Sequence, residues 1–130
     1  MNITCAIIDD EPLAIDLLKS YVLRTPFLKL ENTFSNAIDA TDQLTTNPVN
    51  LVFCDIQMPD LDGLSLARML PETTRIIFTT AFSQYALDSY KNNALDYLLK
   101  PISYQDFLTA ANKARDWFSL LHKATQPTAD

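Results

Sequence analysis

The sequence predicts a doubly wound α/β fold, in which five parallel strands form one sheet and five helices cover its two faces. Short apolar runs alternate along the chain with segments of helical periodicity, as in successive β-α-β units. The runs Cys5–Ile8 and Leu51–Cys54 contain no polar residue, which is typical of strands buried on both faces. The length of 130 residues, 48% of them apolar, suits a single domain with its own core.

The first third of the chain predicts two strands with a helix between them. Residues 3–9 form the first strand, and the helix begins at Pro12 because proline suits the first helical turn. Apolar side chains then recur at helical spacing: Ala14, Leu17, Leu18, Tyr21 and Val22. Leu28, Leu30 and Thr33 alternate with polar neighbours, so we expect a strand at the edge of the sheet.

The middle of the chain predicts a second helix and the central strand. Residues 36–46 form the helix, with Ile38 and Leu44 facing inward, and Pro48 follows its end. Residues 50–55 form the third strand, which the unbroken apolar run places between two layers of helices.

The second half predicts two more strands and three helices. A short helix spans about 64–70, a strand covers Arg75–Thr80, a helix covers Ser83–Asn92 and a short strand covers Asp96–Leu99. The segment Ser103-Tyr104-Gln105-Asp106 has the form of a capping box and begins the last helix, which continues to Leu121. We place the domain at residues 1–123 and the start of a linker at 124–130, where the composition changes.

Charge and composition argue against several classes of function. The net charge of −6 and the scattered Lys and Arg argue against direct binding of nucleic acid. No apolar stretch approaches a membrane span, and the N-terminus lacks the features of a secretory signal, so we expect a cytoplasmic protein. Cys5 and Cys54 are expected to be buried free thiols. The single glycine, Gly63, excludes the glycine-rich loops that cradle nucleotide phosphates.

Polar residues stand at the expected carboxyl ends of four strands. Asp9 and Asp10 follow the first strand, Asp55 ends the third, Thr80 ends the fourth and Lys100 follows the fifth. Ligands of such sheets bind beyond these ends, where the strand order reverses. Carboxylates gathered there suit Mg²⁺, and a carboxylate beside a metal can accept a phosphoryl group. The pattern therefore predicts a cation site at which Asp55 is phosphorylated.

Five motifs, in order and on the expected elements, carry a family resemblance over residues 3–121. They are Ile8-Asp9-Asp10-Glu11-Pro12, Asp55-Ile56-Gln57-Met58-Pro59, Asp62-Gly63, Thr79-Thr80-Ala81 and Leu99-Lys100-Pro101. The chain resembles the receiver domain of a two-component response regulator, which implies a flavodoxin-like sheet of order 2-1-3-4-5. Residues 80–87 and 94–102 are similar to receivers attached to LytTR-type DNA-binding domains.

The resemblance assigns roles to particular residues. Asp55 would accept a phosphoryl group from a histidine kinase, and Thr80 and Lys100 would contact that group. Mg²⁺ would be held by Asp9, Asp10, Asp55 and the backbone carbonyl of Gln57, while Glu11 is expected to cap the first helix. Tyr97 would couple the site to the outer surface as a switch, and the Lys100–Pro101 bond would be cis.

The output surface is expected on the fourth helix, the fifth strand and the last helix. Five aromatic residues lie near these elements and mark a possible partner or homodimer face: Tyr85, Tyr90, Tyr97, Tyr104 and Phe107. The domain would promote its own phosphorylation and dephosphorylation as a signalling domain rather than act as an enzyme.

Three alternatives remain at this point. One is a phosphorylation-independent interaction module on the same fold. Another is a hydrolase with an aspartyl-phosphate intermediate, although Gln57 stands where such enzymes carry a second aspartate. The third is a flavin carrier, although the acidic segment after the first strand would repel phosphate.

Overall fold

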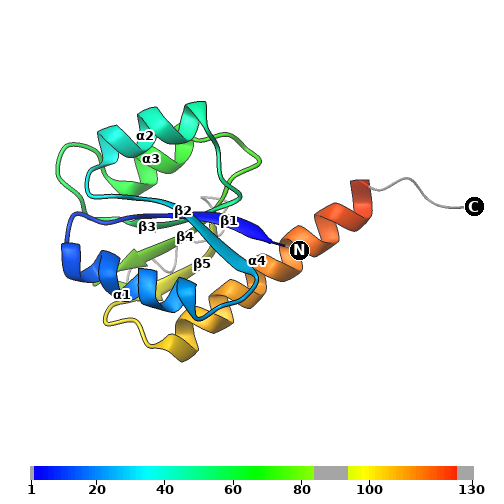
Figure 1. Ribbon diagram of the computed structural model, residues 1–130. Coiled ribbons are helices and arrows are strands. Elements are labelled where there is room, and N and C mark those ends of the chain that lie inside the picture. Colours follow the sequence, from blue (N-terminus) through cyan, green and yellow to red (C-terminus); the bar gives the residue numbers. More distant parts are fainter. Residues whose placement is uncertain (1, 84–93, 126–130) are drawn as a thin grey trace, which may run out of the picture.

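The computed structural model describes residues 2–83 and 94–125 and has a five-stranded parallel sheet of order β2-β1-β3-β4-β5 (Figure 1). The strands are β1 (Ile3–Ile8), β2 (Leu28–Phe34), β3 (Leu51–Asp55), β4 (Arg75–Thr80) and β5 (Ala94–Leu99). The helices are α1 (Pro12–Leu23), α2 (Ala37–Thr46), α3 (Gly63–Met69) and α4 (Tyr104–Thr125). The predicted strand order and parallel direction are therefore confirmed.

The described part of the chain contains four helices, whereas the sequence predicts five. The remaining predicted helix, Ser83–Asn92, lies outside the described residues apart from Ser83. No helix within residues 2–83 and 94–125 has both the length and the apolar composition needed to cross a membrane.

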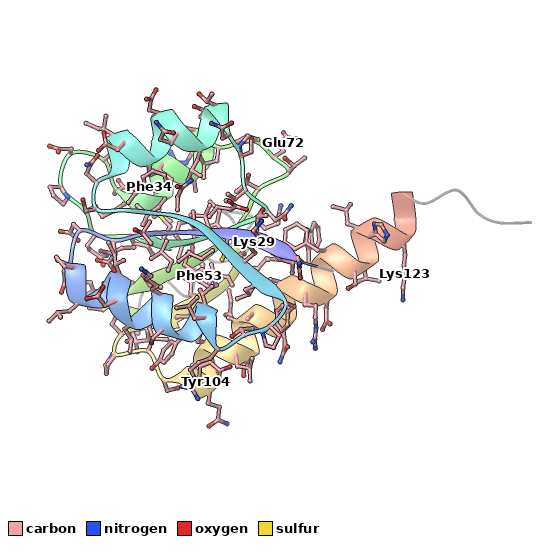
Figure 2. All side chains as sticks on the ribbon, in the orientation of Figure 1. Lys29, Phe34, Phe53, Glu72, Tyr104 and Lys123 are labelled. Carbon is pink, nitrogen blue, oxygen red and sulfur yellow. The ribbon has the colours of Figure 1, made fainter. Side chains whose placement is uncertain are left out.

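The sheet separates two apolar layers. Helices α1 and α4 lie on one face of the sheet, and α2 and α3 lie on the other (Figure 1). On the first face, Phe53 stacks on Phe107 with ring centroids 5.0 Å apart, and Figure 2 shows Phe53 between the sheet and these helices. On the second face, Phe78 packs with Leu44 and Leu66 in one buried cluster. Burial on both sides holds the strand ends, and hence the site, in fixed positions.

Of the two positions of the second helix predicted to face inward, Leu44 is buried as predicted and Ile38 is not. Ile38 is 61% exposed, because α2 turns Ala37, Ala40 and Leu44 toward the sheet. Asn36 caps this helix, its side chain accepting a hydrogen bond from the backbone N–H of Asp39.

β2 is the edge strand that the sequence predicts, and its Thr33 is exposed. The pairing of β1 with β2 shifts between Leu30 and Asn32, and this extra residue puts Thr33, opposite Ile7, on the same face of the sheet as Leu30, opposite Cys5. Phe34 lies on the other face and packs against the core on the side of α2 (Figure 2).

Two of the five aromatic residues predicted to mark the output surface, Tyr104 and Phe107 of α4, face α1 instead. Tyr104 and Phe107 lie 5.3 and 5.4 Å from the ring of Tyr21, and Phe107 is fully buried. The Tyr21 hydroxyl donates to the carbonyl of Ile102, which ties α1 to the segment before α4. These two rings therefore belong to the core, while Tyr85 and Tyr90 lie outside the described residues.

Candidate functional site

The carboxyl ends of the central strands bring the predicted site residues together. Asp9 directly follows β1, Asp55 ends β3 and Thr80 ends β4. The parallel register aligns these ends, since Ile8 is opposite Cys54 and Asp55 is opposite Thr79. Lys100 follows β5, and its backbone N–H donates to the carbonyl of Thr80 over 2.7 Å. Each of these side chains thus comes from a different strand of one rigid sheet.

Three carboxylates form the centre of the site. One oxygen from each of Asp9, Asp10 and Asp55 lies within 4.8 Å of the others. Asp9 is completely buried and Asp55 is 2% exposed, whereas Asp10 is open to solvent. Burial raises the pKa of Asp55 to about 7, and the charges of Asp9 and Asp10 add to this effect. The opposing effect of Lys100 only partly offsets them.

Lys100 is the cation that holds these acids together. Its Nζ lies 2.9 Å from Asp9 Oδ2, 3.6 Å from Asp55 Oδ1 and 3.9 Å from Glu11 Oε1. Burial lowers the pKa of Lys100, but its hydrogen bond to Asp9 and the surrounding carboxylates outweigh burial, so its pKa is raised. The Lys100–Pro101 peptide bond is cis, as predicted.

Glu11 occupies the N-cap position of α1, but its side chain makes no capping hydrogen bond. The prediction that Glu11 caps the first helix is therefore confirmed for its position, although its carboxylate takes no part in the cap. Its carboxylate instead approaches Lys100, and its backbone N–H donates to Asp9 Oδ1 over 2.9 Å. That bond and the one from Lys100 together fix both oxygens of Asp9.

The donor set fits a magnesium ion. Mg²⁺ prefers oxygen ligands and is commonly held by one or two carboxylates, with water and phosphate oxygens completing its shell. Asp9, Asp10 and Asp55 supply such oxygens close together, and the exposed Asp10 leaves one side of the cluster accessible to water. Burial is the main cause of the raised pKa of Asp55, and the charges of Asp9 and Asp10 add a repulsion that a divalent cation would relieve.

Thr80 makes an unforeseen contact with the side chain of Gln57. The Thr80 hydroxyl donates to Gln57 Oε1 over 3.0 Å and accepts from the backbone N–H of Phe82, also over 3.0 Å. Sequence reasoning assigned only the backbone of Gln57 to the site. The signal for its side chain was its position two residues after Asp55, on the same sheet edge as Thr80.

Gly63 allows the loop after β3 to pass close to the acceptor residue. Its backbone N–H donates to the carbonyl of Ile56 over 2.9 Å. A Cβ at this position would lie 2.2 Å from the backbone oxygen of Asp55, so a side chain would displace the loop. Asp62 then begins α3 by accepting from the N–H of Ser65 over 2.8 Å. The Asp62-Gly63 motif thus supports the backbone beneath Asp55.

Tyr97 lies on β5, half-buried, on the face covered by α2 and α3. Its ring centroid is 5.2 Å from that of Phe78, a residue of β4. Tyr97 therefore packs beside the strand that ends in Thr80. This position places it between the core and the surface, whereas the carboxylates lie beyond the strand ends.

Comparison with known proteins identifies the family. A model of the response regulator receiver domain matches residues 5–112. An uncharacterized response regulatory protein of Shewanella oneidensis is 43% identical over 102 residues, which are 77% of this chain and 43% of that protein. The transcriptional regulatory protein BtsR of Escherichia coli is 38% identical over 98 residues, covering 74% of this chain and 41% of BtsR.

A solved structure agrees with these relatives. The response regulatory domain of MrkE from Klebsiella pneumoniae superposes with a TM-score of 0.82 and 27% identity, covering 90% of this chain and 98% of that domain. The chain spans about half the length of the curated relatives it matches. Because the family model matches most of the chain and includes every strand-end residue described above, the chain belongs to the response regulator receiver domain family.

Proposed function

We propose that this domain accepts a phosphoryl group on Asp55 in a reaction that depends on Mg²⁺. The main support for this proposal is the cluster of Asp9, Asp10 and Asp55 with Lys100 at the carboxyl edge of the sheet. Phosphoryl transfer is achieved mostly by positioning and by compensation of negative charge. A buried acceptor with an ammonium 3.6 Å from its Oδ1 supplies both.

The donor in this proposal is a phosphohistidine of a sensor histidine kinase. A carboxylate oxygen of Asp55 forms a bond to phosphorus, while the bond from phosphorus to the imidazole nitrogen breaks. The electron pair of that bond stays on the imidazole, which then binds a proton from solvent. When bound, Mg²⁺ neutralises charge on the transferring oxygens and on the acceptor. The backbone carbonyl of Gln57 is a further proposed metal ligand.

The chain's own residues prepare Asp55 for attack. Only the ionised carboxylate is a nucleophile, and without a metal ion the pKa of Asp55 is about 7, even with Lys100 beside it. Lys100 opposes the rise in this pKa and stays charged beside the product. The Thr80 hydroxyl is the donor proposed to bind a phosphoryl oxygen. At a low fixed concentration of Mg²⁺, acetyl phosphate should therefore label the domain faster as the pH rises, and a higher concentration of Mg²⁺ should shift this profile to lower pH.

Phosphorylation is proposed to switch an output surface. Inward movement of Thr80 would change the packing of Tyr97, whose ring contacts Phe78 of the same strand as Thr80. The affected face includes β5 and α4, and we propose that a kinase or a second copy of the domain recognises it; the helix that the sequence predicts at 83–92, also expected on this face, lies outside the described residues apart from Ser83. We assign residues 1–123 to the receiver and 124–130 to the start of a linker.

The output in the full-length regulator is proposed to be a LytTR DNA-binding domain. Support comes from the similarity of residues 80–87 and 94–102 to receivers of that type. The relatives are about twice as long as this chain, and one of them is a transcriptional regulatory protein. In this proposal the receiver itself does not bind DNA, in keeping with its net charge of −6.

Intact mass spectrometry after incubation with acetyl phosphate and Mg²⁺ tests the acceptor. We expect a gain of one phosphoryl group that disappears with EDTA and in Asp55→Asn. The matched control is Asp62→Asn, which changes a nearby carboxylate outside the cluster. Labelling that persists in Asp55→Asn would contradict the assignment, and no labelling by acetyl phosphate or by a kinase would favour a phosphorylation-independent interaction module.

A further inference from the structure

The single donor hydrogen of the Thr80 hydroxyl is already used in the described structure. A threonine hydroxyl has one hydrogen to donate, and Thr80 donates it to Gln57 Oε1. The N–H of Phe82 occupies one of the acceptor positions on the same oxygen. Thr80 therefore cannot donate to a second acceptor while the bond to Gln57 persists.

Within residues 2–83 and 94–125, the side-chain amide of Gln57 has one hydrogen-bonded atom, Oε1, and one atom without a partner, Nε2. Its Nε2 is buried and has no hydrogen-bond partner in the part of the chain that the structure describes. A buried donor without a partner is unfavourable, so a specific reason is needed for the amide to stay where it is. The hydrogen bond with Thr80 is the one polar interaction of this amide that the described residues show.

The loop after β3 places the side chain of Gln57 within hydrogen-bonding distance of Thr80. Gln57 stands two residues after Asp55, and the N–H of Ile56 donates to the carbonyl of Thr79 over 3.0 Å. The Gly63–Ile56 hydrogen bond closes the other side of this loop. Both backbone polar groups of Ile56, the residue before Gln57, are thus hydrogen-bonded, which holds Gln57 close to the end of β4.

We propose that Gln57 is a positioning residue that competes with the phosphoryl group for the hydroxyl of Thr80. This proposal rests on phosphorylation of Asp55. The Gln57 amide holds Thr80 in the resting arrangement, and the phosphoryl oxygens must displace it before Thr80 can donate to them. The free energy needed to break the hydrogen bond between Gln57 and Thr80 therefore lowers the affinity of the site for a phosphoryl group.

Beryllium fluoride, a phosphoryl mimic that binds carboxylates, provides the test. Its affinity for the domain is measured with Mg²⁺ present in the native chain, Gln57→Met, Thr80→Val and the double variant. Two-dimensional amide spectra report binding, and the Phe82 N–H reports the resting state because it donates to Thr80. Gln57→Met keeps the length of the side chain while removing the acceptor and the unpartnered donor.

We expect Gln57→Met to bind beryllium fluoride roughly threefold to tenfold more tightly than the native chain, the range given by one net hydrogen bond. Before the mimic is added, the Phe82 resonance should already have moved. In the Thr80→Val background the same substitution should leave the affinity unchanged, since there is no hydroxyl to release. Gln57→Leu should behave like Gln57→Met, and Gln105→Met on exposed α4 should match the native chain.

Two results would overturn the proposal in different ways. Equal affinities of the native chain and Gln57→Met, or the same gain in the Thr80→Val background, would reject competition while leaving phosphorylation of Asp55 intact. Absence of binding to the native chain under conditions in which Mg²⁺ binds would reject the proposed function and the competition together. A purely structural role of Gln57 would instead lower the unfolding temperature without a gain in affinity.

Discussion

The amino edge of the sheet is held by neutral hydrogen bonds, whereas the carboxyl edge is held by charges. At the amino edge, Asn50 Oδ1 accepts from both the N–H and the hydroxyl of Thr4 over 2.9 Å each, and Thr4 Oγ1 accepts from the N–H of Asn50 over 3.0 Å. The hydroxyl of Thr74 donates to the carbonyl of Val49 over 2.8 Å. At the carboxyl edge, Asp9 and Asp55 share the ammonium of Lys100.

This difference separates stability from response within one sheet. Neutral pairs contribute similarly at any pH, whereas charged groups contribute according to their protonation and to the ions around them. The carboxyl edge also holds Gln57 Nε2, which is buried and without a partner among the described residues. We infer that the amino edge maintains the fold, while the carboxyl edge keeps interactions that a ligand can rearrange.

The largest expected effect is that of Asp55→Asn at alkaline pH. The folded pKa of Asp55 is about 7, above its unfolded value near 4, so the folded state binds the extra proton between these values. The stabilisation that comes from this proton on Asp55 is complete below pH 4 and is lost as the pH rises through 7. Urea unfolding should therefore show the variant more stable at pH 8, by up to about 4 kcal/mol.

The native and variant stabilities should converge near pH 4, where the native carboxyl is protonated as well. Mg²⁺ should stabilise the native chain at pH 8 and have a smaller effect on Asp55→Asn. A constant difference across this pH range would show that repulsion at Asp55 is not the source of the gain.

The sequence predicted the carboxyl edge better than the rest of the molecule. Asp9, Asp55, Thr80 and Lys100 converge because parallel strands end at one edge, so locating the strand ends was enough to bring them together. The side chain of Gln57 was missed because its contact with Thr80 depends on the path of a loop. Loop paths follow from tertiary contacts, such as the approach of Gly63 to Asp55, rather than from local periodicity.

The error at Ile38 also comes from packing that local periodicity does not encode. Ile38 is more apolar than Ala37, so the pattern of hydrophobicity alone predicted that Ile38 faces inward. In the structure the small residues Ala37 and Ala40 face the sheet, together with Leu44. The bulge in β2, which puts Phe34 on the side of α2, leaves no clear signal in the sequence.

The second effect in size is the loss of the shared cation in Lys100→Met. Asp9 is fully buried and would lose a 2.9 Å ion pair, so we expect a loss of about 3 kcal/mol in the free energy of unfolding at pH 8. The control is Lys113→Met, whose exposed pair with Asp96 is 3.1 Å long and should contribute less than about 1 kcal/mol. If urea unfolding showed equal losses of free energy in Lys100→Met and Lys113→Met, burial would not strengthen the ion pair between Lys100 and Asp9.

A smaller effect at the opposite edge separates the two regions. Asn50→Ala removes the acceptor of two hydrogen bonds from Thr4, so we expect a loss of about 1.5 kcal/mol. This loss should be the same at pH 5 and pH 8, and labelling by acetyl phosphate should proceed at the native rate. A pH-dependent loss, or slower labelling in a folded variant, would show that the edges are coupled through β3.

The smallest effect concerns two adjacent threonines with opposite surroundings. Thr79 is fully buried and its hydroxyl has no partner in the described structure, whereas the Thr80 hydroxyl bonds to Gln57 and Phe82. Thr79→Val should therefore raise the free energy of unfolding by about 1 kcal/mol and leave the affinity for beryllium fluoride unchanged. Thr80→Val should lower that affinity. If Thr79→Val destabilised the domain instead, a buried water bound to its hydroxyl would be the physical explanation, and the neutral core beneath Asp55 would also contain a polar site.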